Sequence, residues 1–267
     1  MSQRLRSRYD RHPIRKARRI PRNFRKPNYR FLAALFFFTT IISGLASFAF
    51  QTPSLLVREV KISGVCLADK KSIKRAGELA LGRNIIFLRK SNIISRISSL
   101  PEVKEVNVDR RFPNKVWIFV TERRPDAILT DGRVCAMIQL DGLMFHRVPG
   151  PVRGIPTVQV AGCDSICVGQ VSRSQNVKYA LDALACARRE KLTVTKISVD
   201  HVGDICLNME DGFYVKLGQP DEIPRKMAIL RSALVCKPSI GREAVYIDLS
   251  CPNAPVWKPK LIAGSAS

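Results

Sequence analysis

The stretch RFPNKVWIFVTERRP, residues 111–125, contains a short β-rich run between two prolines. Proline fixes φ and has no backbone N–H, so Pro113 and Pro125 set the limits within which a strand begins and ends. Within these limits Val116, Ile118 and Val120 alternate with other side chains, as they do in a strand with one buried face. The stretch therefore predicts a strand that ends in Glu-Arg-Arg-Pro.

The residues before this strand predict a small α+β domain over 55–125 with the order β-α-α-β-β. Residues 59–63 alternate like a strand, and helices are expected over about 69–80 and 91–100, the second stopped by Pro101. A three-stranded sheet with both helices on one face is the compact solution. The side chains expected to face the helices are Val60, Ile62, Val106, Val108, Val116, Ile118 and Val120.

Two aromatic residues of the opening stretch, Trp117 and Phe119, fall on the opposite face of the predicted sheet. We expect the next domain to cover them. The alternative is an exposed contact patch on this domain, because large apolar groups left in solvent mark interaction sites.

The residues 126–259 predict a second domain, a mostly antiparallel β domain with two helices. Asp141-Gly142 and Asp211-Gly212 each separate two β-rich runs, which is a strong hairpin signal. Helices are expected over about 174–191 and 224–236, and a last strand over 244–250. Residues 260–267 are expected to form a flexible tail.

The amino-terminal 50 residues combine a basic arm with an apolar segment. Residues 1–30 carry twelve Lys or Arg and one Asp, so +11 of the net charge of +23 lies there. Residues 31–50 hold no charged residue, and a helix of that length spans ~30 Å, the thickness of a bilayer core. We expect a single-pass type II transmembrane helix with a cytoplasmic amino terminus. A buried core helix and a signal peptide cleaved near Gly44-Leu45-Ala46 are the alternatives.

The basic arm is explained by membrane topology and by attraction to anionic lipids, so no nucleic-acid partner is expected. No catalytic site, metal site or cofactor is expected either. The three histidines, His12, His146 and His201, are far apart in sequence, and no nucleotide-loop, zinc-protease or hydrolase motif occurs.

The eight cysteines include no Cys-x-x-Cys pair. Their position beyond the apolar segment permits disulfides; Cys163, Cys167, Cys186 and Cys206 are the better candidates, and Cys251 is expected to be buried.

The segment LPEVKEVNVDRRFPNKVWIFVTERRPDAIL, residues 100–129, resembles the POTRA domain of the FtsQ/DivIB cell-division proteins. It departs from the family pattern at Glu102, where an aromatic residue is frequent, and at Phe112, where Trp is frequent. DGFYVKLGQPDEIPRKMAILRSAL (211–234) and VYIDLS (245–250) resemble later signatures of the family. The matching residues of the first segment are Leu100, Pro101, Val103, Arg110, Phe112, Pro113, Glu122, Pro125 and Ala127.

The resemblance implies a non-catalytic protein of the bacterial division septum, located in the inner membrane. It implies binding to proteins of the FtsB and FtsL type on the outer side of the membrane and control of septal peptidoglycan synthesis. In this family the final strand pairs with a strand of FtsB, and the preceding helix lines the contact. The residues so implicated are Val245, Tyr246, Ile247, Asp248, Leu249, Ser250, Trp257 and Arg231.

The last strand is short and late in the chain, so we expect it at a sheet edge, where a partner strand can be added. Val245, Ile247 and Leu249 would then point into the core, and Tyr246, Asp248 and Ser250 outward. An ordinary interior strand is the alternative. A further alternative for the whole protein is a POTRA-containing export or assembly factor that binds client strands.

Overall fold

The computed structural model describes residues 28–51, 53–162 and 165–260, apart from the side chains of residues 46 and 49–51. The chain divides into two units, Met1–Thr52 and Pro53–Ser267. The predicted basic arm up to residue 27 and the predicted tail from 261 onward lie outside the described residues.

The helix of the first unit, α1 (Tyr29–Gln51), includes the apolar segment 31–50. Its described side chains are all exposed. Within the described residues, no helix satisfies the length and apolarity needed to cross a membrane.

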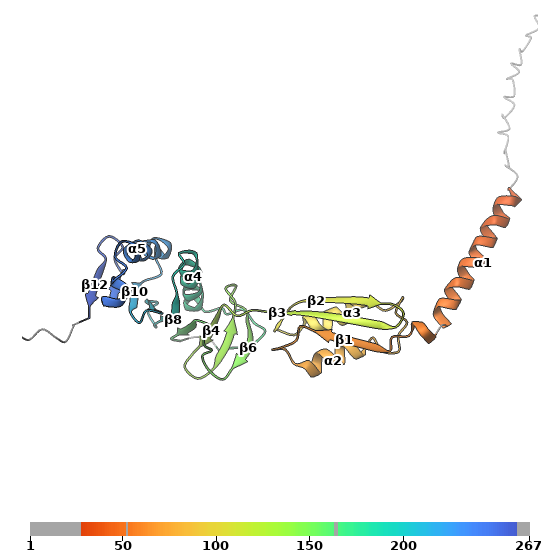
Figure 1. The fold of residues 1–267 in the computed structure, drawn as a ribbon, viewed down its shortest axis with the longest axis horizontal. Helices are drawn as coiled ribbons and strands as arrows, with labels where there is room; N and C mark the ends of the chain where they lie inside the picture. The colour runs from red at the N-terminus through yellow and green to blue at the C-terminus, as the bar shows by residue number, and fades with distance from the viewer. Residues whose placement is uncertain (1–27, 52, 163–164, 261–267) are drawn as a thin grey trace, which may run out of the picture. The chain divides into compact units, whose positions relative to one another are not determined.

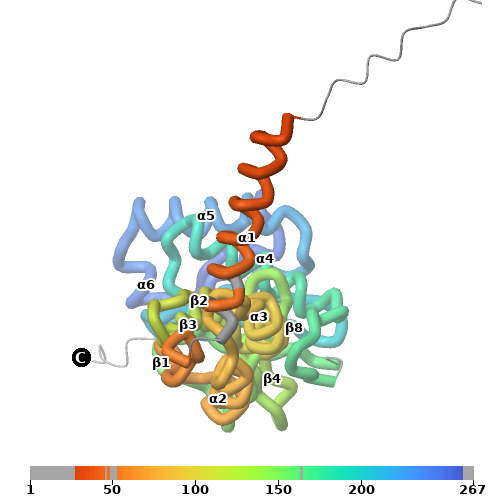
Figure 2. Tube along the Cα trace, turned by 90° about the vertical axis from the view of Figure 1, so that its right-hand side faces the viewer, coloured from red at the N-terminus to blue at the C-terminus, as the bar shows by residue number. Residues whose placement is uncertain are grey.

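The second unit begins with the predicted β-α-α-β-β domain, preceded by a short 3-10 helix, η1 (Pro53–Leu55). The strand order is β1-β3-β2, with β3 parallel to β1 and antiparallel to β2, and both helices lie on one face (Figures 1 and 2). Asp69 caps the first helix, as its oxygens accept from the N–H groups of Lys71 and Ser72 at 3.0 and 3.1 Å. The elements are β1 (Glu59–Ser63), α2 (Lys70–Glu78), α3 (Lys90–Ser98), β2 (Val103–Arg111) and β3 (Lys115–Glu122).

The core of this domain contains the seven residues predicted from alternation. Val108, Val116, Ile118 and Val120 are buried, and Val60, Ile62 and Val106 are half-buried against them. Helix α2 approaches the sheet closely at Gly77, where an added Cβ would lie 3.2 Å from Ile118 Cδ1 and 3.2 Å from Val60 Cγ1. The predicted period and face of each strand are therefore confirmed.

The second domain is one nine-stranded mixed sheet with α4 (Gln175–Arg189) and α5 (Ile223–Cys236) packed on one face (Figure 1). Its order is β12-β11-β10-β9-β8-β7-β4-β5-β6, with three parallel pairs. Both Asp-Gly hairpins form, as β5–β6 and β9–β10. The strands are β4 (Ala127–Thr130), β5 (Cys135–Ile138), β6 (Met144–Val148), β7 (Thr157–Val160), β8 (Val194–Val199), β9 (Ile205–Met209), β10 (Tyr214–Gly218), β11 (Ala244–Asp248) and β12 (Val256–Pro259).

The Glu-Arg-Arg-Pro sequence at the end of β3 joins the two domains. The Glu122 carboxylate accepts from the N–H groups of Cys66, Leu67 and Ala68 at 2.8–2.9 Å. This fixes the loop so that Leu67 packs against a small cluster of the second domain around Phe145. Burial acts to raise the pKa of Glu122, but the three N–H donors outweigh it and the pKa is lowered.

Arg123 continues the junction, since its guanidinium donates to the Pro101 carbonyl at 3.1 Å and to Gln139 Oε1 at 2.8 Å. The hydrophobic clusters of Pro53–Ser267 consist of buried residues from Val57 onward, with Leu55 packed against the first of them, among the residues that the structure describes. Because Pro53–Ser267 is a compact unit with cores of its own, we expect residues 53–260 to fold as a separate fragment.

Candidate partner-binding surface

The last strand predicted from the sequence, β11, is an interior strand. It lies between β10, which is parallel to it, and β12, which is antiparallel. The expectation that β11 forms the edge is wrong, because the residues after the turn at 251–255 return as β12 and cover it. The edge of the sheet is β12, which includes Trp257, one of the implicated residues.

The side chains of β11 follow the predicted alternation only in part. Ile247 and Leu249 are buried, and Ser250 is exposed, as expected. Val245 is only half-buried, because an irregularity in the β11–β12 register between residues 244 and 246 places Ala244 in the core instead. Tyr246 and Asp248 are half-buried on the polar face of the sheet, where the Tyr246 ring stacks on Tyr214 with 5.4 Å between centroids.

The edge strand β12 presents different chemistry on its two faces. Trp257 pairs with Ile247, packs against the main core, and lies under Lys237 of the segment after α5, with 4.8 Å from Nζ to the ring centroid. On the other face Val256 is 60% exposed and Lys258 is exposed. Pro259 ends the strand and has no N–H to offer a further ladder. The result is a short edge with an aromatic anchor on one side.

A buried lysine holds the neighbouring strand in place. Lys226 of α5 is fully buried, and its ammonium donates to the carbonyls of Leu217 and Gln219 at 2.9 and 3.0 Å and to Asp221 Oδ1 at 2.9 Å. All three N–H donors of the ammonium group are used. The lysine therefore holds α5 against the end of β10, the strand next to β11 in the sheet.

Arg231, the implicated residue of the preceding helix, is directed to the other helix. Its guanidinium donates to the Glu190 carbonyl at 2.7 Å, at the carboxyl-terminal end of α4. Arg231 therefore fixes α5 against α4.

The aromatic pair of the first domain is not covered by the second domain, so that expectation is wrong. Trp117 is half-buried under side chains of its own sheet: Arg111 Cζ lies 4.7 Å and Lys61 Nζ 6.0 Å from its ring centroid. Phe119 meets Trp117 edge-on and is 39% exposed. The cover comes from cation–π contacts within the domain, which alternation cannot reveal.

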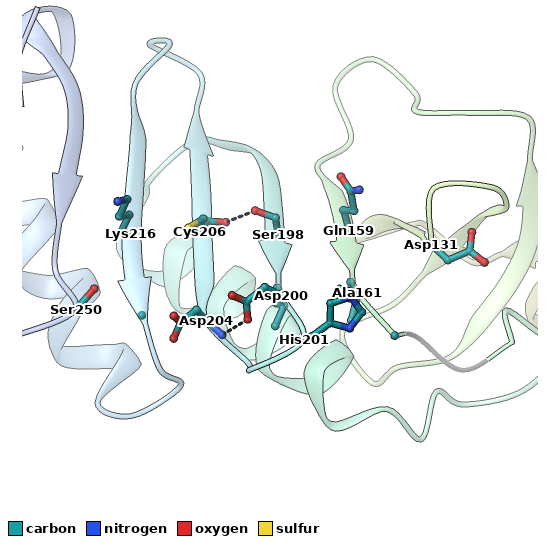
Figure 3. Close-up of a pocket in the computed structure, with 14 residues that line it drawn as sticks. Asp131, Gln159, Ala161, Ser198, Asp200, His201, Asp204, Cys206, Lys216 and Ser250 are labelled. Carbon is teal, nitrogen blue, oxygen red and sulfur yellow. Dashed lines mark hydrogen bonds between the residues drawn. The ribbon is translucent and has the colours of Figure 1, made fainter.

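A hollow of about 730 Å³ lies on the polar face of the second sheet (Figure 3). It is lined by Ser198, Cys206 and Lys216 from three neighbouring strands, with Asp200 and His201 at one end. Burial raises the pKa of the Cys206 thiol, and Lys216 offsets only part of that effect. A thiol with a raised pKa is a poor nucleophile, so this hollow is not arranged for cysteine catalysis.

The remaining chemistry-bearing residues lie apart. His146 is 3.3 Å from Glu102 at the domain junction, and His12 lies outside the described residues. Cys186 and Cys206 are free, as are the other five described cysteines, whereas Cys163 lies outside the described residues. Cys251 is exposed, contrary to expectation, because β11 ends at Asp248 and Cys251 begins the turn that leads to β12, beyond the last buried residue of this segment, Leu249.

Known proteins resemble this chain in its first domain and along most of its length. Residues 55–123 match the family model "POTRA domain, FtsQ-type". Cell division protein FtsQ of Mycobacteroides abscessus is 26% identical over 219 residues, which cover 82% of this chain and 66% of that protein. FtsQ of Streptomyces coelicolor is 23% identical over 241 residues (88% and 90%), and DivIB of Clostridium botulinum is 21% identical over 240 residues (87% and 93%).

The first domain is thus a POTRA domain of FtsQ type. The similarity to FtsQ and DivIB cell-division proteins extends over most of the chain, so the family resemblance predicted from the sequence is confirmed. These relatives support a role in cell division.

Proposed function

We propose that the protein is a non-enzymatic scaffold of the bacterial division machinery. It binds division proteins of the FtsB and FtsL type on the outer side of the inner membrane and helps control septal peptidoglycan synthesis. The similarity to cell-division proteins supports the division role. The observation that carries the binding mode is the edge position of β12 in the nine-stranded sheet.

An edge strand has one row of backbone N–H and C=O groups that no neighbour uses, and a partner strand can pair with them. On β12 this row is short, because Pro259 ends it. Backbone bonds would supply part of the affinity, and Val256, Trp257 and Lys258 would distinguish one partner from another. Tyr246 and Asp248 of β11 lie on the same face as Val256 and Lys258 and extend the contact.

The charges around the edge indicate the character of the partner strand. Lys258 is exposed, and Lys260 follows it with its ammonium bound to the Arg242 carbonyl at 2.9 Å. On the helix side, the Glu243 carboxylate forms an ion pair with Lys237, with 3.5 Å between Oε2 and Nζ. Lys258 therefore favours a partner strand with an acidic side chain opposite it, whereas Asp248 next to Val256 favours a basic one there, since complementary charge guides association.

The apolar segment 31–50 supplies the membrane anchor in this proposal, with residues 1–30 in the cytoplasm. Its support is the sequence, a charge-free run of twenty residues after a strongly basic arm. Attraction of the arm to anionic lipids strengthens the attachment.

The test is capture of the outer segments of the host's FtsB- and FtsL-type proteins by residues 53–260. Three proteins are compared: the wild type, Trp257→Pro in the edge strand, and Val152→Pro in an exposed loop outside the sheet. Circular dichroism first establishes that each variant folds.

The proposal predicts capture by the wild type and by Val152→Pro, and at least about tenfold weaker capture by Trp257→Pro, because proline removes a backbone donor and disturbs pairing. Equal capture by all three would place the interface elsewhere. Absence of capture by the wild type would contradict the proposed partners and favour the export or assembly alternative.

A further inference from the structure

One end of the POTRA domain combines exposed apolar side chains with unpaired cations. It is formed by three segments, residues 55–58 before β1, residues 81–89 between the helices, and residues 110–115 around the β2–β3 turn. We name this end the basal surface. Its segments are joined by backbone bonds from Val57 N to Arg83 O (2.9 Å), from Ile85 N to Leu55 O (2.9 Å) and from Arg58 N to Asn114 O (2.9 Å).

The basal surface is apolar to an unusual degree for this unit. Four large apolar side chains are exposed on it by 38–63%: Leu81, Ile86, Phe87 and Phe112. They are four of the eleven exposed large apolar residues in the described part of Pro53–Ser267. A group of such side chains on adjacent segments marks an interaction surface.

The charge of the basal surface is positive. Arg58, Arg83 and Arg89 are exposed, and within the described part of the chain none of them forms an ion pair. Of the nearby acidic groups, Glu59 is held by Lys115 at 2.8 Å and Lys61 at 3.4 Å. Two further acids lie close in sequence to these segments: Glu78 ends α2, and Asp109 lies on β2 just before residues 110–115.

Apolar side chains set among arginines are the pattern of a surface that rests on an anionic bilayer. The apolar groups enter the headgroup boundary and the cations meet the lipid phosphates. Chain connectivity favours this occupant: Leu55, bonded to the basal surface, is four residues after Gln51. Four extended residues span at most about 14 Å, so an anchor in the membrane would keep this end close to the bilayer.

We propose that the basal surface binds anionic phospholipid and holds the POTRA domain against the membrane. This inference rests on the proposed membrane anchor of the preceding section. A second contact with the bilayer would restrict the directions in which the outer domains can point.

The test uses residues 53–260, which belong to the compact unit Pro53–Ser267, and measures co-sedimentation with two kinds of vesicle. One kind is phosphatidylcholine alone, and the other is phosphatidylcholine mixed with phosphatidylglycerol. The charge variant is Arg83→Glu with Arg89→Glu. Its matched control is Arg153→Glu with Arg173→Glu, which changes the net charge equally at exposed arginines of the second domain.

We expect the wild type and the control to bind mixed vesicles and to be released by salt, and the charge variant to bind at least about tenfold more weakly, given the contribution of each cation near an anionic surface. Leu81→Ser with Ile86→Ser tests the apolar contribution, with a loss of about tenfold expected. Circular dichroism and thermal unfolding confirm that each variant is folded.

The proposal is overturned if the wild type does not prefer anionic vesicles, or if the control loses as much binding as the charge variant. The first of these results would indicate a protein occupant for the basal surface. The proposed membrane anchor is tested separately: if carbonate releases the full-length chain from membranes, the anchor proposal is wrong. Partner capture by residues 53–260 depends neither on the anchor nor on lipid binding by the basal surface.

Discussion

Replacement of Lys226 by methionine tests whether the buried ammonium holds α5 to the end of β10. Methionine keeps the apolar stem but leaves the carbonyls of Leu217 and Gln219 without their donor. An unsatisfied buried acceptor costs about 1–3 kcal/mol. The third partner, Asp221, is 62% exposed and is hydrated by water when the lysine is absent. The loss therefore comes from the two carbonyls, and we expect Lys226→Met to lower the free energy of unfolding by about 3 kcal/mol.

The assay is urea unfolding of residues 53–260, in which the midpoint should fall with little change in slope. Asp221→Asn is the matched control, because it weakens only the exposed partner and should cost less than about 1 kcal/mol. If Lys226→Met were within about 1 kcal/mol of the wild type, the three hydrogen bonds would not be what positions the strand.

Three other contacts of the fold lead to predictions of their own. Glu122→Gln should lower the free energy of unfolding at pH 7. Because the pKa of Glu122 is lower in the folded protein, the stabilisation by its carboxylate is fully present above the ordinary pKa of 4.5 and is lost as the pH falls through the folded-state pKa. The unfolding curves of the wild type and the variant should therefore converge in acid. A constant difference at all pH values would contradict this. Gly77→Leu should destabilise by about 2–3 kcal/mol in thermal unfolding by overpacking the contact with Ile118, and an unchanged melting temperature would refute the close approach. Trp257→Ala should weaken partner capture with a loss of stability of about 1–2 kcal/mol, and full capture would exclude the tryptophan as an anchor.

The POTRA domain could be predicted from local signals. Alternation at Val116, Ile118 and Val120, the start of a helix near residue 69 and the stop at Pro101 each depend on residues within a few positions, and each is confirmed. The two Asp-Gly hairpins are of the same kind. Such signals act through backbone geometry and hold in most tertiary settings.

The sheet edge could not be predicted in the same way. Whether β11 is internal depends on whether β12 forms beside it. The residues of β12, Val256–Pro259, include Lys258 and Pro259 and show no clear alternation of apolar and polar side chains, so the sequence does not indicate a strand there. Strand order is set by pairing between residues far apart in sequence. The register of β11 and β12 is also irregular between residues 244 and 246, and Ala244 is buried in the core where alternation predicts Val245.

The contacts of the Trp117 ring with Lys61 and Arg111 could not be predicted for a related reason. Alternation places it on the open face, but it does not show that Arg111 and Lys61 lie over its ring from the two neighbouring strands. Cross-strand neighbours become known only with the register of the sheet.

The most direct test of the central claim is cross-linking from the edge strand in the full-length protein in dividing cells. A photoreactive residue is placed at Lys258 in β12 and, as the control, at Val152 in an exposed loop. The proposed function predicts adducts with the FtsB-type protein from position 258 and none from 152. Adducts from 152 alone, or from neither position, would contradict recruitment through the last strand.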